Sequence, residues 1–178
     1  MQKVYFFVER GIFELSDDQK TIRLAESESA TTLLDFFSKL VLPLIDTYLI
    51  TMTACEQLCG KNLVIKQKTL VKELHVGIKY LYSQGFLPML HSCIKETIIT
   101  ALSRFAQMDL IESTSYLTKK GNSTQFLRCP SESRPKMKTL LERLHKDRGF
   151  SNQHKVKIFE EVDEVIMRTQ GPIPKPKL

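Results

Sequence analysis

Apolar residues recur at steps of three and four between positions 33 and 52, and this spacing limits the possible folds more than any other feature of the chain. It places the apolar side chains on one face of a helix. A membrane-spanning helix needs about 20 mostly apolar residues, whereas Asp35, Lys39 and Asp46 interrupt this stretch. We therefore interpret it as a buried helix. The periodic residues are Leu33, Leu34, Phe37, Val41, Leu44, Ile45, Tyr48, Leu49 and Met52.

Residues with known positional preferences mark the ends of this helix. The hydroxyl of Ser27 or Ser29 can accept the free backbone N–H groups of a first helical turn. Gly60 and Asn62 tolerate the left-handed backbone conformation in which many helices end. Pro43 lacks a backbone N–H and clashes with the preceding turn, so we expect it to kink or split the helix.

Four further segments carry a helical pattern. Residues 66–84 and 91–108 each place apolar side chains on a single stripe. Residues 131–148 form a basic amphipathic pattern, and a short helix is expected within 156–167.

Two other stretches are typical of β-hairpins. Residues 3–15 are rich in β-branched and aromatic side chains, and residues 22–24 alternate like a returning strand. Residues 113–117 and 124–129 flank a Lys-Lys-Gly-Asn turn signal. The sequence thus predicts a mainly α protein with small β elements (α+β). We expect a helical bundle with an N-terminal β-hairpin and a winged-helix-like hairpin near 111–129.

The charge is unevenly distributed along the 178 residues. The formal net charge is +6, and from Ser131 onward 11 Lys and Arg residues stand against 7 Asp and Glu residues. We therefore divide the chain into a helical domain at 1–130, a basic helical extension at 131–168 and a flexible Pro/Lys tail at 169–178. A basic excess suits an anionic partner such as nucleic acid or an acidic membrane surface.

The residues that most often carry chemistry are sparse. Cys55 and Cys59 share a predicted helix face. A closed zinc site needs two more ligands, and the nearest candidates of a suitable residue type are His91 and Cys93. His91 and Glu96 have the spacing of an acid–base pair, yet they lie in a pattern typical of a core helix. We predict free thiols, no catalytic residue, no cofactor and no metal.

Two basic features could serve as binding surfaces. Lys119 and Lys120 lie at a hairpin tip, as in a winged-helix DNA binder, but the preceding helix offers only Lys95 and Arg104 as cations. A surface hairpin is the favoured interpretation. The basic helix could lie on an anionic membrane, although acidic residues interrupt it and a solvated helix is favoured. Its cations are Lys136, Lys138, Arg143, Lys146 and Arg148.

The segment 40–48 resembles the region that follows the catalytic domain in the glycerol-3-phosphate and dihydroxyacetone-phosphate acyltransferases. In that family a helix carries an apolar–Pro–apolar pair, an acidic residue, Ser or Thr, and Tyr. Residues 8–15 look like the β segment before that helix, and 102–112 look like the family's later helix and exit strand. The resemblance covers 4–129. The motif residues here are Pro43, Leu44, Ile45, Asp46, Thr47 and Tyr48.

This resemblance implies a non-catalytic C-terminal domain or fragment of a membrane-associated sn-1 O-acyltransferase of glycerophospholipid biosynthesis, which uses acyl-CoA. The family's His-x-x-x-x-Asp block is absent from the chain, so we expect a catalytic domain, in cis or in trans, as the partner. Pro43, Asp46, Thr47 and Tyr48 would have structural roles, with the Tyr48 hydroxyl hydrogen-bonded.

The implied location is the cytosolic face of the mitochondrial outer membrane or the endoplasmic reticulum. The ending Pro176-Lys177-Leu178 fits a peroxisomal address only in its last two residues. The alternative function is a winged-helix-like nucleic-acid-binding module, which the residues favour less.

Overall fold

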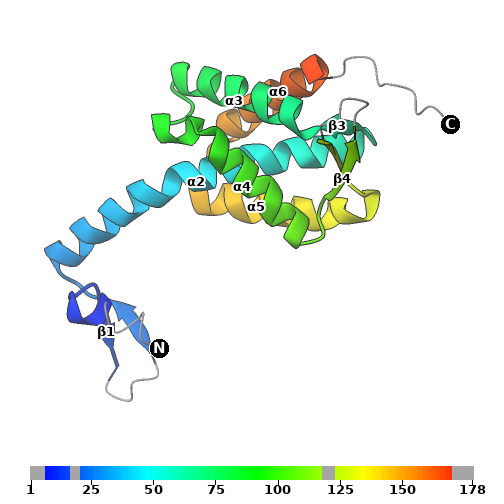
Figure 1. The fold of residues 1–178 in the computed structure, drawn as a ribbon. Coiled ribbons are helices and arrows are strands. Elements are labelled where there is room, and N and C mark those ends of the chain that lie inside the picture. Colours follow the sequence, from blue (N-terminus) through cyan, green and yellow to red (C-terminus); the bar gives the residue numbers. More distant parts are fainter. Residues whose placement is uncertain (1–6, 17–20, 118–122, 170–178) are drawn as a thin grey trace. The chain divides into compact units, whose positions relative to one another are not determined.

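The computed structural model describes residues 7–16, 21–117 and 123–169. The chain divides into two compact units, Met1–Leu42 and Pro43–Leu178. Helix α2 (Glu28–Gly60) contributes its first half to one unit and its second half to the other. Figure 1 shows the elements in chain order.

The first unit contains the predicted N-terminal β-hairpin. Strands β1 (Phe13–Leu15) and β2 (Ile22–Leu24) pair antiparallel. The strand expected at residues 3–9 is wrong for residues 7–9, which form a helical turn, while residues 3–6 lie outside the described part of the chain. The turn closes with hydrogen bonds from Gly11 N to Val8 O and from Ile12 N to Phe7 O, both 2.9 Å. Gly11 permits this closure because its φ is +65°.

Helix α2 begins and ends near the predicted residues. Ser27 caps its start, because the Ser27 Oγ accepts a hydrogen bond of 3.1 Å from the backbone N–H of Ala30. Pro43 does not split the helix, which is continuous through it. Of the two outcomes expected at Pro43, a kink or a split, the split is thus excluded.

Four helices of the second unit end where a residue adopts a positive φ. These residues are Asn62, Gly85, Asp109 and Gly149. After Asn62, Gly85 and Asp109, the backbone N–H of the following residue donates to the carbonyl five residues earlier. This hydrogen bond gives a partner to one of the free carbonyls at the end of the helix. The pairs are Leu63 to Leu58, Phe86 to Leu81 and Leu110 to Phe105.

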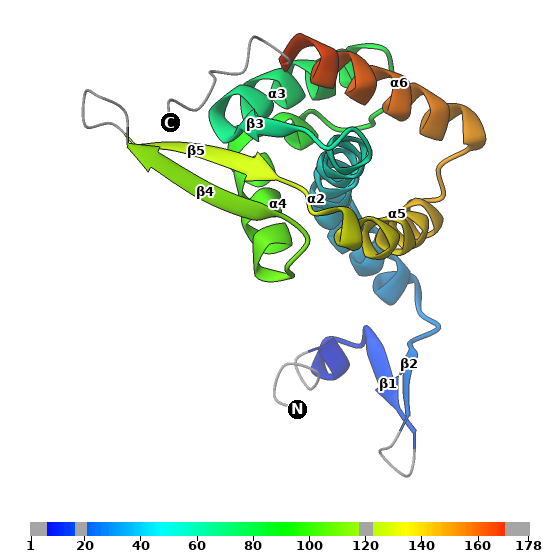
Figure 2. The ribbon, with the colours of Figure 1, turned by 90° about the vertical axis from the view of Figure 1, so that its right-hand side faces the viewer.

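The second half of α2 lies at the centre of the second unit and is surrounded by the other helices (Figures 1 and 2). The predicted helices at 66–84, 131–148 and 156–167 are present. The single helix expected at 91–108 is wrong in its first part, which is a 3-10 turn followed by Ile94 in an extended conformation. The helices are α3 (Gln67–Ser83), η1 (Leu90–Cys93), α4 (Lys95–Gln107), η2 (Ser131–Ser133), α5 (Arg134–Arg148) and α6 (Asn152–Thr169).

A small antiparallel sheet completes this unit. The predicted hairpin is formed by β4 (Glu112–Leu117) and β5 (Ser123–Arg128). A third strand that the sequence did not indicate, β3 (Val64–Lys66), pairs with the other edge of β5. The predicted class, mainly α with small β elements, is confirmed.

The core of the second unit draws on α2 to α6 and on β3 and β5. Segment 131–168, which sequence set apart from 1–130, contributes Met137 from α5 and four core residues from α6. Gly77 allows α3 and α6 to approach closely, since a Cβ there would lie 2.8 Å from Val165 Cγ2. The α6 residues are Ile158, Val162, Val165 and Ile166.

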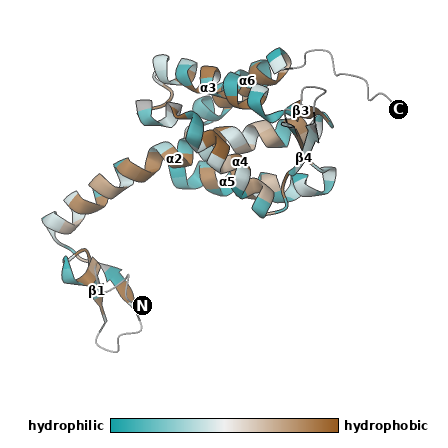
Figure 3. Ribbon diagram, in the orientation of Figure 1, coloured by the Kyte–Doolittle hydropathy of each residue, from teal (hydrophilic) through white to brown (hydrophobic). Residues whose placement is uncertain are grey.

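The two halves of α2 differ in burial. Every residue from Leu49 to Cys59 is buried. The interpretation of residues 33–52 as a buried helix is wrong for the first part, where large apolar side chains face solvent, and Figure 3 shows apolar colours along this part of the helix. We call this set the α2 apolar face. Its residues are Leu34, Phe36, Phe37, Leu40 and Val41, with exposed fractions from 36% to 56%.

Candidate functional site

Asp46, the acidic residue of the family-like motif, is fully buried on α2. Arg148 at the end of α5 donates from Nε to Asp46 Oδ1 at 2.6 Å and from Nη2 to Oδ2 at 3.5 Å. Burial raises the pKa of the Asp46 carboxyl, and Arg148 opposes that shift. Arg148 also lies 4.7 Å from the ring centroid of Phe150. The motif carboxylate is thus neutralised by a residue 102 positions away.

Thr47 links α2 to the η1 turn before α4. The Thr47 hydroxyl lies 2.9 Å from the Pro43 carbonyl and 3.0 Å from the Ser92 carbonyl, so its single proton can serve either acceptor. Thr47 and Ser92 are both buried. The Thr47 hydroxyl therefore contributes to the contact between α2 and η1.

Tyr48 is half-buried and packs against α4. Its ring meets that of Phe105 edge to face, with centroids 5.7 Å apart and planes at 88°. The expected hydrogen bond of the Tyr48 hydroxyl is not found among the residues that the structure describes. Partial exposure explains this difference, because a hydroxyl at the surface can bond to solvent.

The structure does not assemble the possible acid–base pair. His91 is exposed in η1 and Glu96 is exposed in the first turn of α4, and no hydrogen bond or ion pair joins these two described side chains. Lys119 and Lys120 lie outside the described residues. Of the cations on α4, Arg104 donates a hydrogen bond to Gln107.

Three cysteine thiols are buried together between α2 and the segment after β5. Cys55, Cys59 and Cys129 are free, and the Cys59 thiol donates to the Pro130 carbonyl at 3.1 Å. A hydrogen bond with Cys129, together with burial, raises the pKa of Cys55 well above its ordinary value. Within the described parts of the chain, no group of three or more His, Cys, Asp or Glu side chains is arranged to hold a metal ion.

Several cations of the basic helix α5 are engaged in internal contacts. Arg148 pairs with Asp46, and Arg134 Nε pairs with Glu56 Oε1 at 2.8 Å. The Lys136 ammonium donates to the carbonyl of Met108 at 3.1 Å. Three of the six Lys and Arg residues of this helix therefore contact the rest of its own unit.

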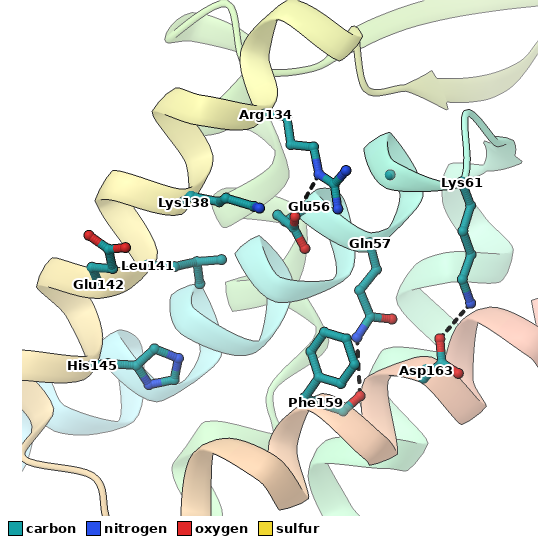
Figure 4. A pocket seen from close by; sticks show the side chains of 11 residues that line it. Glu56, Gln57, Lys61, Arg134, Lys138, Leu141, Glu142, His145, Phe159 and Asp163 are labelled. Atoms are coloured by element: carbon teal, nitrogen blue, oxygen red, sulfur yellow. Dashed lines mark hydrogen bonds and ion pairs between the residues drawn. The ribbon is translucent and has the colours of Figure 1, made fainter. Parts of the chain in front are cut away.

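A groove of about 500 Å³ lies between α5 and α6, with α2 as its floor (Figure 4). We call it the α5–α6 groove. Two ion pairs cross it, Arg134 with Glu56 and Lys61 with Asp163. Its lining residues are Glu56, Gln57, Gly60 and Lys61, then Arg134, Lys138, Leu141, Glu142 and His145, and finally Phe159 and Asp163.

Sequence reasoning missed Arg148 and the groove residues. An acidic residue inside an apolar pattern does indicate a buried partner, since an unpaired buried carboxylate is costly. The pattern cannot say which of the 26 Lys and Arg residues that partner is. No local signal marks Gln57 or His145, because the groove forms only when α2, α5 and α6 come together.

Within the described ranges, no helix combines the length and the apolar character needed to cross a membrane. A search of curated proteins returned no match. The family described as "Glycerol-3-phosphate acyltransferase C-terminal region" matches residues 1–114, which include the whole motif around Tyr48. This match confirms the resemblance. It covers well over half of the chain, which therefore belongs to the glycerol-3-phosphate acyltransferase C-terminal region family.

Proposed function

We propose that this chain is the non-catalytic C-terminal part of a glycerol-3-phosphate or dihydroxyacetone-phosphate O-acyltransferase. It supports acyl-CoA-dependent acylation of the sn-1 hydroxyl by a catalytic domain that is present in the same protein or supplied separately. The family match supports the association with such an enzyme. The described motif side chains support a structural role, because Asp46 and Thr47 bond within the fold and Tyr48 packs on Phe105.

The α2 apolar face is the observation that carries the docking part of this proposal. Five large apolar side chains gather on little more than two turns of one helix. Contiguous apolar surface of this kind marks interaction sites in soluble proteins. The family description names a C-terminal region of the acyltransferase, so the enzyme's remaining domain is the occupant to which we commit.

The test is an acyltransferase assay with the purified chain, alone and mixed with a separately expressed catalytic domain from the same source. We expect no activity from the chain alone. We expect it to bind the catalytic domain and to raise that domain's activity or solubility.

Matched variants locate the surface. Phe36→Ser with Leu40→Ser changes two side chains that are 54% and 56% exposed, so the fold should tolerate it. The control is Val156→Ser with Met167→Ser on α6, where the exposed fractions are 57% and 61%. The proposal is supported if the Phe36→Ser, Leu40→Ser variant loses binding to the catalytic domain and the α6 control variant keeps it. Equal binding by both pairs, or no binding by the unaltered chain, contradicts docking through α2.

We further propose that this assembly works at the cytosolic face of a membrane, either the mitochondrial outer membrane or the endoplasmic reticulum. The proposal follows from the lipid product of the enzyme class. Subcellular fractionation of the tagged chain, with and without the catalytic domain, tests it. A chain found only in the nucleus would instead favour the nucleic-acid alternative, which salt-dependent duplex binding would then examine.

A further inference from the structure

The α5–α6 groove contains two buried polar atoms that have no protein partner. They are the Oε1 atom of Gln57 on α2 and the Nδ1 atom of His145 on α5. Gln57 is only 4% exposed. Buried polar atoms in proteins nearly always have a hydrogen-bond partner, so two orphans in one groove call for an explanation.

The orientation of Gln57 determines what it can bind. Its Nε2 donates a hydrogen bond of 3.1 Å to the backbone carbonyl of Phe159. If the Gln57 amide were flipped, its Oε1 would face the Phe159 carbonyl oxygen, and neither atom can donate a hydrogen bond. The Nε2 atom therefore faces Phe159, and Oε1 is the atom without a partner. The group that satisfies Gln57 must therefore be a hydrogen-bond donor.

The surroundings of His145 favour its neutral imidazole form. Burial lowers its pKa, and the charge of Lys155 lowers it further. In a neutral ring Nδ1 is an acceptor in one tautomer and a donor in the other. A hydroxyl group can serve Nδ1 in either tautomer, because it both donates and accepts.

The charges of the groove favour a ligand without net charge. Its three cations, Lys61, Arg134 and Lys138, are matched by three carboxylates, and two of these cations are already paired. Beside the polar groups, the ring of Phe159 lies over the floor and is 52% exposed, which offers a flat apolar surface (Figure 4). The three carboxylates are Glu56, Glu142 and Asp163.

We propose that the α5–α6 groove is a binding site for a small polyhydroxylated ligand. Its hydroxyls bond Gln57 Oε1 and His145 Nδ1, and its C–H face rests on Phe159. Because both atoms are buried, side chains that line the groove must move to admit the ligand to them. This site is independent of the docking proposed for the α2 apolar face.

The experiment is an NMR titration of the isotope-labelled full chain with myo-inositol and with xylitol, up to about 50 mM, a range that reveals millimolar affinities. We expect saturable shifts of the Gln57 side-chain amide and the His145 ring. Gln57→Leu and His145→Phe should each weaken binding by about fivefold, the equivalent of one neutral hydrogen bond. Amide dispersion in the spectrum checks that each variant is folded. If Gln57→Leu does not fold, His145→Phe carries the comparison.

The control variant is Glu142→Gln, because the Glu142 carboxylate lines the groove but points away from its centre in Figure 4. Its affinity for the polyols should be unchanged. The proposal is overturned if the polyols produce no saturable shifts. It is also overturned if Gln57→Leu and His145→Phe both bind the polyols as tightly as the unaltered chain does. Equal shifts with inorganic phosphate alone also overturn it, since they would identify an anion site at Lys138.

Discussion

At the scale of single residues, the buried pair of Asp46 and Arg148 has the largest energetic consequences. Asp46 is fully buried and Arg148 is only 14% exposed in its side chain. Removing one member of such a pair leaves an uncompensated charge, which costs about 3–5 kcal/mol. We predict that Arg148→Met lowers the free energy of unfolding by about that amount at pH 7.5, as measured by urea denaturation.

The same variant should respond to pH in a defined direction. The folded-state pKa of Asp46 is raised above its unfolded value, so the stability linked to this group is greatest below about pH 4 and is lost as pH rises through the folded pKa. Without Arg148 the folded pKa rises further. The deficit of Arg148→Met relative to the unaltered chain should therefore shrink from pH 7.5 to pH 4.5. A constant deficit would show that lost packing, and not charge, is responsible.

Tyr48 acts through its ring. Because the ring packs on Phe105, Tyr48→Ala should lower the free energy of unfolding by about 1–3 kcal/mol. Tyr48→Phe keeps the ring and loses a hydroxyl with no partner among the described residues, so it should stay within about 0.5 kcal/mol. Thermal melts of both variants make the comparison. An Ala variant with an unchanged midpoint would argue against the structural role of this motif residue.

At the scale of elements, the contact between α3 and α6 depends on Gly77. A Cβ at this position would lie 2.8 Å from Val165 Cγ2 and 3.0 Å from Glu161 Oε1, and both neighbours are buried. We predict that Gly77→Ala lowers the free energy of unfolding by about 1 kcal/mol, since overpacking outweighs the gain in helix propensity.

A double-mutant cycle isolates this contact. In the background of Val165→Ala the methyl at 2.8 Å is gone and the contact with Glu161 Oε1 at 3.0 Å remains, so Gly77→Ala should cost less there than in the unaltered chain. The two substitutions should thus be non-additive, as is usual for side chains in direct contact. Strict additivity in chemical denaturation would mean that the helices simply move apart.

At the scale of the whole molecule, α5 and α6 are built into the second unit. They supply core side chains, and Arg148 neutralises Asp46. We predict that a chain ending at residue 130 loses cooperative thermal unfolding in circular dichroism, because it exposes the core and leaves a buried carboxylate unpaired. A chain ending at residue 169 is the control and should melt like the full chain. Equal melting of all three chains would show that the family-matched region folds alone.

Much of the secondary structure was predictable from the sequence because it rests on local patterns. The steps of three and four in 66–84 produce α3, and the turn signal after Leu117 lies between β4 and β5. β3 was not predictable, since it has only three residues and is defined by its pairing with β5. The break at Ile94 was hidden by an apolar pattern that continues through it.

Local patterns in the amino-acid sequence were enough to predict the helix periodicity, the two hairpins and the motif that indicates the family. What covers each apolar stripe depends instead on tertiary contacts. The two halves of α2 have the same spacing, yet residues 49–59 are buried and the α2 apolar face is exposed. Periodicity states which side chains share a face, whereas burial depends on contacts between distant residues. Asp46 and Arg148, 102 positions apart, show this most directly, because no local pattern could select one arginine as the partner of that carboxylate.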